Sequence, residues 1–250
     1  VPASSSDDTT DELAENAILS DRVRLQFNTS FRGSDTLGLE VEAGNTPNLG
    51  ESTGTNMARL AFDQGEGNDL ALSQLFYQFP IGNSANAAIV LNGQFFDFVD
   101  TVNSVVGSDL RGSVSRFGVR SPIYRTGGGG AGASLSYDLS NFANLTLVYL
   151  AGEASDPESG IFAGAYAALG QLTLKPDDNL SVGLTYVRSY NAIATGTGSA
   201  NSDAPFGTES SSVTGNSYGL EASWRVSPSF TLSGWLGLTT ATASDLPENP

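Results

Sequence analysis

Short stretches in which apolar side chains alternate with small polar ones recur along most of this sequence, each closed by a turn of Pro, Asp, Asn or Ser. LSVGLTY at 180–186 and SYGLEASW at 217–224 are two examples. A period of two is that of a β-strand, with one apolar face and one polar face. Many such strands in succession predict either a sheet that lies on a core or a barrel with a wet interior.

The alternation predicts an all-β, antiparallel fold that begins after residues 1–20. That first segment is acidic and rich in Ser and Thr, and we interpret it as a flexible leader or linker, with a short helix over 10–19 capped by Thr10 as the alternative. Residues 21–250 form the expected barrel region. Strands are expected at 22–29, 36–43, 56–62, 70–79, 87–96, 130–138, 145–151, 164–174, 180–190, 216–225 and 230–240.

The expected connections come in two sizes that alternate in the second half of the chain. Turns at 139–144, 175–179 and 226–229 are short, whereas the loops at 97–129, 152–163 and 191–215 are long and polar. Short periplasmic turns and long extracellular loops are typical of a bacterial outer-membrane barrel.

The first half breaks this alternation, because the expected connections at 63–69 and 79–86 are both short. One strand is therefore misread there. Bacterial barrels close with an even number of strands, so the odd count also predicts that closing C-terminal strands are missing. We expect the chain to be a segment of a larger exported protein, since no signal peptide begins at Val1 and 246–250 does not read as a strand.

The apolar face of the last four expected strands carries no charge. A barrel surface in contact with lipid would exclude charges, and so would the buried core of a sandwich. Large aromatic side chains distinguish the two, because they lie near strand ends, as in the aromatic girdles of a membrane barrel. The aromatic residues concerned are Tyr77, Phe79, Tyr137, Tyr149, Tyr166, Tyr186, Tyr218, Trp224 and Phe230.

The opposite face carries charged and amide side chains, as expected of a wet lumen. If the first hairpin turns about Gly33, Arg24 lies opposite Glu42 and Gln26 lies opposite Glu40. We predict that Arg24, Glu40, Glu42, Glu221 and Arg225 line a pore, although an ion pair on an ordinary exposed sheet would look the same.

Arginine supplies ten of the eleven basic residues, and Arg111, Arg116, Arg120 and Arg125 belong to the longest loop or its exit. A guanidinium keeps its charge and its planar fork, so it suits a fixed patch that screens solutes by charge or stacks against sugars. We add Arg116, Arg120 and Arg125 to the predicted pore lining. The glycine run at 127–130 enters a strand rather than a helix, so it favours close packing against a wall over phosphate binding.

Composition excludes several function classes. The chain has no Cys and no His, which removes metal sites and catalytic triads built on them, and it has a single lysine. A formal charge of -16 argues against nucleic acid as a partner. Acid pairs such as Asp97 with Asp100 are better explained by turns and solvation than by calcium binding or glycoside hydrolysis. We therefore predict no catalytic residue, no metal and no cofactor.

Four blocks of sequence carry a resemblance to a known family. They are DRVRLQFNTSFRGSDTLGLEVEAGN, ARLAFD followed by LFYQFPIG, SRFGVRSPIYRTGGGGAGASLSYDLS, and GAYAALGQLTLKPDDNLSVGLTYVRSY. In this order the chain resembles the cyanobacterial outer-membrane porins of the OprB-like class over roughly 21–240. The resemblance implies a trimeric passive channel for ions and small hydrophilic solutes, with carbohydrates and iron named for related proteins. It also implies attachment to peptidoglycan through an N-terminal surface-layer-homology module, which this sequence lacks.

Two other readings stay open at this point. A secreted or surface β-sandwich could bind carbohydrate through Tyr124, Trp224 or Trp235, and it would bury both tryptophans at mid-strand. An outer-membrane barrel enzyme such as a lipase or protease is disfavoured by the missing histidine.

Overall fold

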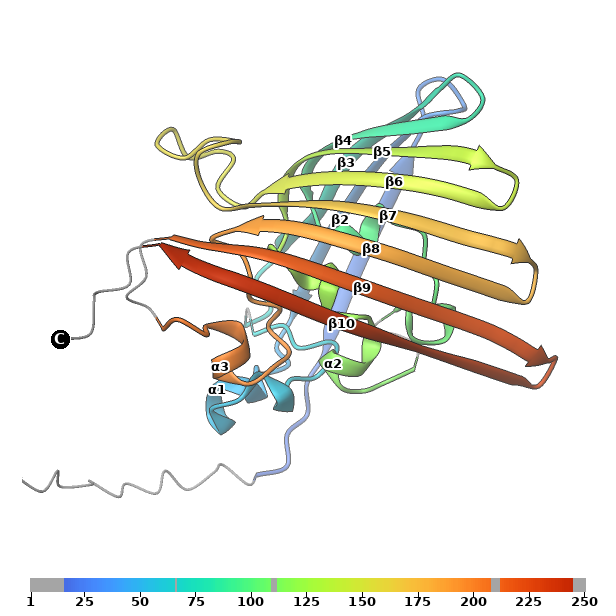
Figure 1. The fold of residues 1–250 in the computed structure, drawn as a ribbon. Coiled ribbons are helices and arrows are strands. Elements are labelled where there is room, and N and C mark those ends of the chain that lie inside the picture. Colours follow the sequence, from blue (N-terminus) through green and yellow to red (C-terminus); the bar gives the residue numbers. More distant parts are fainter. Residues whose placement is uncertain (1–15, 66, 109–111, 208–211, 245–250) are drawn as a thin grey trace, which may run out of the picture.

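A computed structural model describes residues 16–65, 67–108, 112–207 and 212–244. Most of this region forms one antiparallel sheet of ten strands (Figure 1). The strands are β1 Arg22–Thr29, β2 Thr36–Gly44, β3 Ala71–Ile81, β4 Ala85–Gly93, β5 Gly130–Ser140, β6 Ala143–Ala151, β7 Tyr166–Asp177, β8 Leu180–Tyr190, β9 Ser212–Ser227 and β10 Phe230–Ser244.

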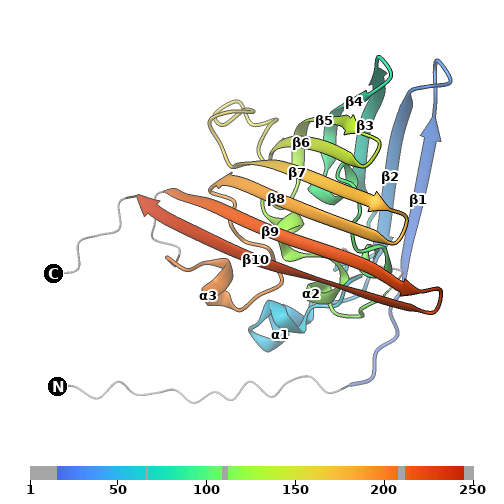
Figure 2. The same cartoon turned by 45° about the vertical axis from the view of Figure 1, so that its right-hand side comes forward.

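Each strand pairs with the next along the chain, in the order β1 to β10. The sheet curves strongly, and its two edge strands, β1 and β10, run in clearly different directions (Figure 2). Within the described residues β1 and β10 do not pair with each other, so the sheet is an open, barrel-like wall. The all-β, antiparallel, porin-like prediction of an incomplete barrel is confirmed.

Ten of the eleven predicted strands are present, and the one expected at 56–62 is wrong. That segment contains the 3-10 helix η1 Asn56–Ala58, followed by an isolated bridge from Leu60 to Ser115. Met57 of η1 is 65% exposed, so this segment does not form the half-buried face of a strand. Without this strand, short turns and long connections alternate through the whole sheet, and the long ones are 45–70, 94–129, 152–165 and 191–211.

The outer, convex face is apolar and exposed along the sheet. In the middle of it, Leu184 of β8 lies between Leu172 of β7 and Leu220 of β9, and Leu236 of β10 continues the row. Leu184 is 47% exposed and Leu236 is 71% exposed. An uncovered apolar surface of this size would be costly in water but is stable in lipid. The exposed face therefore excludes the sandwich reading for the described sheet.

Aromatic side chains on this outer face gather towards the two ends of the strands. Tyr149, Tyr166 and Tyr190 stack in sequence near the long loops, with ring centroids 5.6 and 5.7 Å apart. Trp224 and Phe230 lie at the short-turn end and are 50% and 56% exposed. This distribution matches the predicted girdles.

The prediction that no charge interrupts the apolar face is wrong at one position. Arg188 of β8 lies on the outer face, opposite Asn216 of β9, and its Nη1 donates a hydrogen bond of 3.1 Å to Asn216 Oδ1. The side chain sits at the long-loop end, among the tyrosines. A lipid-facing charge costs far less near the interface than at mid-depth, which explains how the sheet tolerates it there.

The inner, concave face is only partly polar, because the long connection 94–129 packs against it. A core forms between apolar inward residues of the sheet, including Val90, Val148 and Val187, and the side chains of Phe95 and Ile123. This connection contains η2 Phe95–Asp97, η3 Ser104–Val106, α2 Arg116–Val119 and η4 Pro122–Arg125. The connection 45–70 adds α1 Leu49–Thr53, and 191–211 adds α3 Ala200–Asp203.

A buried amide fixes the packed connection to the wall. Gln171 of β7 is fully buried. Its Oε1 accepts from the Tyr124 hydroxyl at 2.7 Å, and its Nε2 donates to the Asp100 carbonyl at 2.9 Å. Both groups belong to the connection 94–129, so one wall residue holds two points of the same loop. The predicted close packing of the glycine run is also present, because a Cβ on Gly129 would lie 2.8 Å from the Gly93 carbonyl oxygen.

The expected leader lies mostly outside the described residues, since only 16–20 are described and these have no regular structure. The short helix expected over 10–19 lies largely outside them as well. In the described parts of the chain no helix is long and apolar enough to cross a membrane.

Candidate pore-lining site

A polar cavity of about 310 Å³ lies inside the curved sheet, between the inner faces of β1–β3 and the two connections 45–70 and 94–129. Six arginines and four carboxylates line it, together with amide, hydroxyl and a few apolar side chains. The charged lining residues are Arg22, Arg24, Arg59, Arg116, Arg120, Arg125, Glu40, Glu42, Asp63 and Asp97. The cavity therefore concentrates charge of both signs, with an excess of two positive charges.

The strand side of the cavity is a network of arginines and glutamates. Arg24 pairs with Glu42 and Gln26 with Glu40, the register predicted for the first hairpin. Arg22 Nη2 and Arg24 Nε each lie 2.6 Å from Glu42 Oε2, and Arg24 Nε lies 3.0 Å from Glu40 Oε1. The Glu42 side chain is only 5% exposed, so two guanidinium groups compensate one buried carboxylate.

The loop side of the cavity is organised by Asp63. Its Oδ2 accepts from Arg59 Nε at 2.6 Å and its Oδ1 from Arg59 Nη2 at 3.2 Å, a bidentate pair. Arg116 Nη1 lies 3.5 Å from the same carboxylate. The bridge between Leu60 and Ser115 brings these two loops together. Asp63 therefore fixes one arginine from each long connection at the cavity wall.

A third group places two arginines over an aromatic ring. The guanidinium carbon of Arg120 lies 4.0 Å from the centroid of the Phe96 ring, and that of Arg125 lies 5.8 Å from it. Cation–π contact holds a guanidinium plane without neutralising its charge. Both guanidinium groups therefore lie at the cavity wall beside the Phe96 ring.

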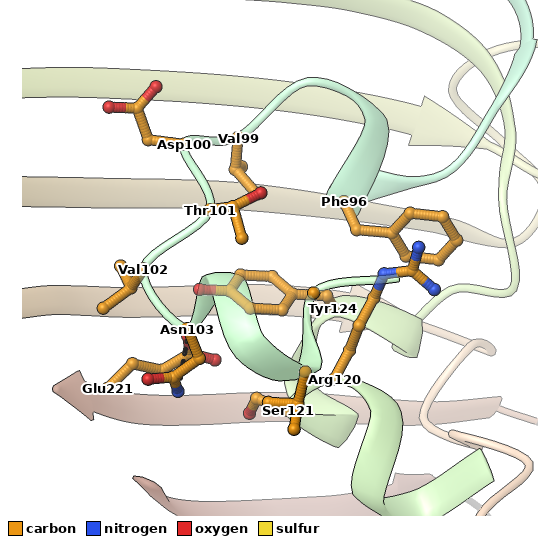
Figure 3. A pocket seen from close by; sticks show the side chains of 12 residues that line it. Phe96, Val99, Asp100, Thr101, Val102, Asn103, Arg120, Ser121, Tyr124 and Glu221 are labelled. Carbon is orange, nitrogen blue, oxygen red and sulfur yellow. Dashed lines mark hydrogen bonds between the residues drawn. The ribbon is translucent and has the colours of Figure 1, made fainter. Parts of the chain in front are cut away.

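Glu221 faces the other side of the connection 94–129. Figure 3 shows it beside Asn103, with Arg120 pointing away towards Phe96. Asn103 Nδ2 donates to Glu221 Oε2 at 3.4 Å and to the Gly234 carbonyl at 3.2 Å. Glu221 is 3% exposed, and the space left around it is only about 20 Å³. Glu221 therefore belongs to the contact between the connection 94–129 and the sheet.

The structure thus brings together six of the eight predicted site residues, namely Arg24, Glu40, Glu42, Arg116, Arg120 and Arg125. Glu221 does not line the cavity, and neither does Arg225, which is exposed on the inner face near the short turn at 228–229. Arg111, noted with the loop arginines, lies outside the described residues.

Sequence reasoning missed Arg22, Arg59, Asp63, Asp97 and Phe96. The wrong strand at 56–62 contained Arg59, and Asp63 was assigned to the short connection at 63–69, although their spacing of four residues is that of a local ion pair. Among the described residues there is no cluster of three or more potential acidic metal ligands.

Together, the exposed apolar outer face and the aromatic girdles are those of a porin-like, incomplete β-barrel wall, with a charged cavity on its inner side. Comparison with known proteins agrees. The family model described as "Carbohydrate-selective porin, OprB family" matches residues 3–245, and the chain belongs to this family. Its members are outer-membrane transport channels, which places this chain in the outer membrane.

Two cyanobacterial relatives support the assignment. An uncharacterized protein of Synechocystis sp. is 36% identical over 231 residues, which cover 89% of this chain and 42% of the relative. An uncharacterized protein of Nostoc sp. is 31% identical over 270 residues, covering 92% of this chain and 45% of the relative. The chain spans less than half the length of both relatives.

Proposed function

We propose that this chain forms part of a passive outer-membrane channel, in which the arginine-rich cavity is the narrow, charge-selective point. Ions and small hydrophilic solutes would cross by diffusion, with carbohydrates suggested by the family description and iron by the resemblance of the sequence. No chemical step is involved. The observation that carries the proposal is the placement of six arginines on the inner side of a sheet whose outer side is apolar and exposed.

Electrostatics predict the sign of selectivity. In a narrow, water-filled cavity, fixed charges on the wall act at short range and are weakly screened. The excess of two positive charges favours anions at that point, whereas the acidic loops elsewhere act over longer distances and are screened by salt.

The test replaces Arg116, Arg120 and Arg125 together with Ala in the full natural polypeptide and records single-channel currents in planar bilayers under a salt gradient. We expect the wild type to show discrete current steps, with a reversal potential whose sign indicates a preference for anions. The triple variant has one excess negative charge at the cavity, so its reversal potential is expected to pass through zero towards cations.

Arg225→Ala is the matched control, because it removes a positive charge from the inner face outside the cavity. It should leave the reversal potential close to that of the wild type. If the triple variant keeps the wild-type selectivity, these arginines do not set the selectivity of the pore. If the folded, inserted wild type carries no current, the channel proposal is wrong.

Assembly is part of the same proposal. We propose a homotrimer embedded in outer-membrane lipid, tethered to peptidoglycan through a module outside this sequence. Cross-linking of the full natural polypeptide in native membranes should yield a trimeric band, and a monomer under conditions that cross-link a known trimeric porin would contradict it.

A further inference from the structure

One arginine interrupts the apolar outer face of β8. Arg188 lies between Ala168 of β7 and Asn216 of β9 in the register of the strands. It follows Leu184, near the middle of β8, by four residues, which is about 13 Å along a strand. The apolar band of an outer-membrane barrel is about 25 Å tall, so this distance is close to half its height. The guanidinium group therefore lies near the level at which the lipid headgroups begin.

Two pairs of tyrosine rings lie on either side of this arginine. Towards the long loops, the ring centroids of Tyr166 and Tyr190 are 5.7 Å apart. Towards the middle of the sheet, those of Tyr186 and Tyr218 are 5.3 Å apart. Arg188 itself is partly exposed. Tyrosine is enriched where a membrane protein passes from hydrocarbon to headgroups, so the arginine and the rings lie at one interface.

The hydrogen bonds at this position leave donors without acceptors. In the described parts of the chain Arg188 has no acidic partner, and its side chain donates only to Asn216 Oδ1, at 3.1 Å. The same oxygen accepts from the Tyr186 hydroxyl at 2.8 Å, so both of its lone pairs are used. The remaining N–H groups of Arg188 and the Nδ2 group of Asn216 have no partner among the described residues. A ligand that fits this position must therefore accept hydrogen bonds.

Charge narrows the class of this ligand further. The positive charge of Arg188 is not compensated by a carboxylate of the described residues, and a guanidinium fork matches the paired oxygens of a phosphate group. A free ion would gain little on an open face, because exposed ion pairs are weak. A phosphorylated lipid adds apolar contact, since its chains lie along the exposed outer face beside Tyr186 and Tyr218.

We propose that Arg188 and Asn216 bind the phosphate group of an anionic lipid in the membrane leaflet at the long-loop end of the sheet. The tyrosine rings on either side pack against the lipid, and the phosphate supplies the negative charge that balances the arginine. The site lies on the opposite face of the sheet from the arginine-rich cavity, so it belongs to anchoring in the membrane and not to solute passage.

The experiment measures lipid retention by native mass spectrometry of the full natural polypeptide in detergent, with phosphatidylglycerol or phosphatidylcholine added. Both lipids carry a phosphate, but only phosphatidylglycerol has a net negative charge. We expect the wild type to retain phosphatidylglycerol in preference to phosphatidylcholine. Arg188→Ala should lower this preference about fivefold, the scale for one basic residue at an anionic lipid surface.

Two further variants accompany this one. Arg225→Ala is the matched control, because it removes the same charge from the inner face of the sheet, and it should keep the wild-type preference. Asn216→Asp has nearly the same shape but places a carboxylate beside Arg188. It should also lose the preference for phosphatidylglycerol, and it keeps the proposal testable if Arg188→Ala does not fold.

Equal retention of both lipids by the wild type would overturn the inference, and so would an unchanged preference in Arg188→Ala and Asn216→Asp. Inorganic phosphate that displaces phosphatidylglycerol would indicate a site for a free anion and overturn it as well. The same spectra report the number of subunits. If lipid-free Arg188→Ala loses the oligomer that the lipid-free wild type forms, this patch is a contact between subunits, and the lipid assignment is wrong.

Discussion

Asp35 closes the turn between β1 and β2 with its side chain. Its Oδ1 accepts from the Ser30 hydroxyl at 2.6 Å and from the Arg32 N–H at 2.7 Å, and its Oδ2 accepts from the Tyr77 hydroxyl at 2.8 Å. The bond from Ser30, with those from Arg32 and Tyr77, holds the pKa of this carboxyl below its usual range. The charged form of Asp35 therefore stabilises the folded turn.

We expect this stabilisation to depend on pH. Because the folded pKa lies below the unfolded value of about 3.9, the contribution is fully present above that pH and is lost as pH falls through the folded pKa. Asp35→Asn should lower the urea midpoint at pH 7 and flatten the acid dependence of unfolding. Asp178→Asn, in the exposed turn before β8, is the control. Identical acid profiles for wild type and Asp35→Asn would contradict the assignment.

At the scale of the element, the strands of the sheet have an exposed apolar outer face and an inner face that is partly covered by the connection 94–129. In β8, Leu184 points to the outer face and is 47% exposed, whereas Thr185 points inward and is buried. A slip of the register by one residue would exchange these two environments, so the outer apolar face and the inner packing together fix the register. Arg188, the charged residue on the outer face of β8, lies near the end of the strand.

Leu184→Arg should therefore destabilise the folded protein by about 2 to 4 kcal/mol, the cost of a charge at mid-depth in lipid. Ser181→Arg in the same strand is the comparison, because Ser181 belongs to the inward set, and its cost should be smaller. Urea unfolding of the two variants in lipid vesicles measures the difference. Equal destabilisation would argue against lipid as the environment of the outer face.

At the scale of the whole molecule, the two ends of the sheet differ in the length of their connections. Turns such as 178–179 close one end, and the connections 152–165 and 191–211 leave the other (Figure 1). In bacterial barrels the short turns face the periplasm and the long loops face the outside. In the proposed channel, this orientation would put the charged cavity on the path between the two sides.

These 250 residues contain no cysteine, so a cysteine introduced into them can test this orientation once any cysteine elsewhere in the full natural polypeptide has been replaced by Ser. In the full natural polypeptide, Ser155→Cys in the long loop 152–165 should react on intact cells with a maleimide coupled to a polymer too large to cross the membrane. Asp178→Cys should react only after the outer membrane is permeabilised. The reverse pattern of labelling would invert the orientation.

Local patterns allowed ten strands, the first hairpin register and the outer apolar face to be predicted, because a period of two is a property of neighbouring residues. The same reasoning failed at 56–62, where the chain forms a 3-10 helix and an isolated bridge to another loop instead of a strand. It also treated the inner face as polar throughout, although Val90, Val148 and Val187 are covered there by the loop 94–129. The alternation of apolar and polar residues alone does not show which other segment packs against a face of the sheet.

The sequence by itself determined the class of protein, since strand period, girdle aromatics and loop lengths are all local quantities. Only the tertiary structure decided which charges meet. Arg24 of β1, Asp63 of one loop and Arg116 of another share one cavity through contacts between residues far apart in the chain. Such contacts depend on how the long connections fold back onto the sheet. The spacing of these residues along the sequence does not show that their side chains meet.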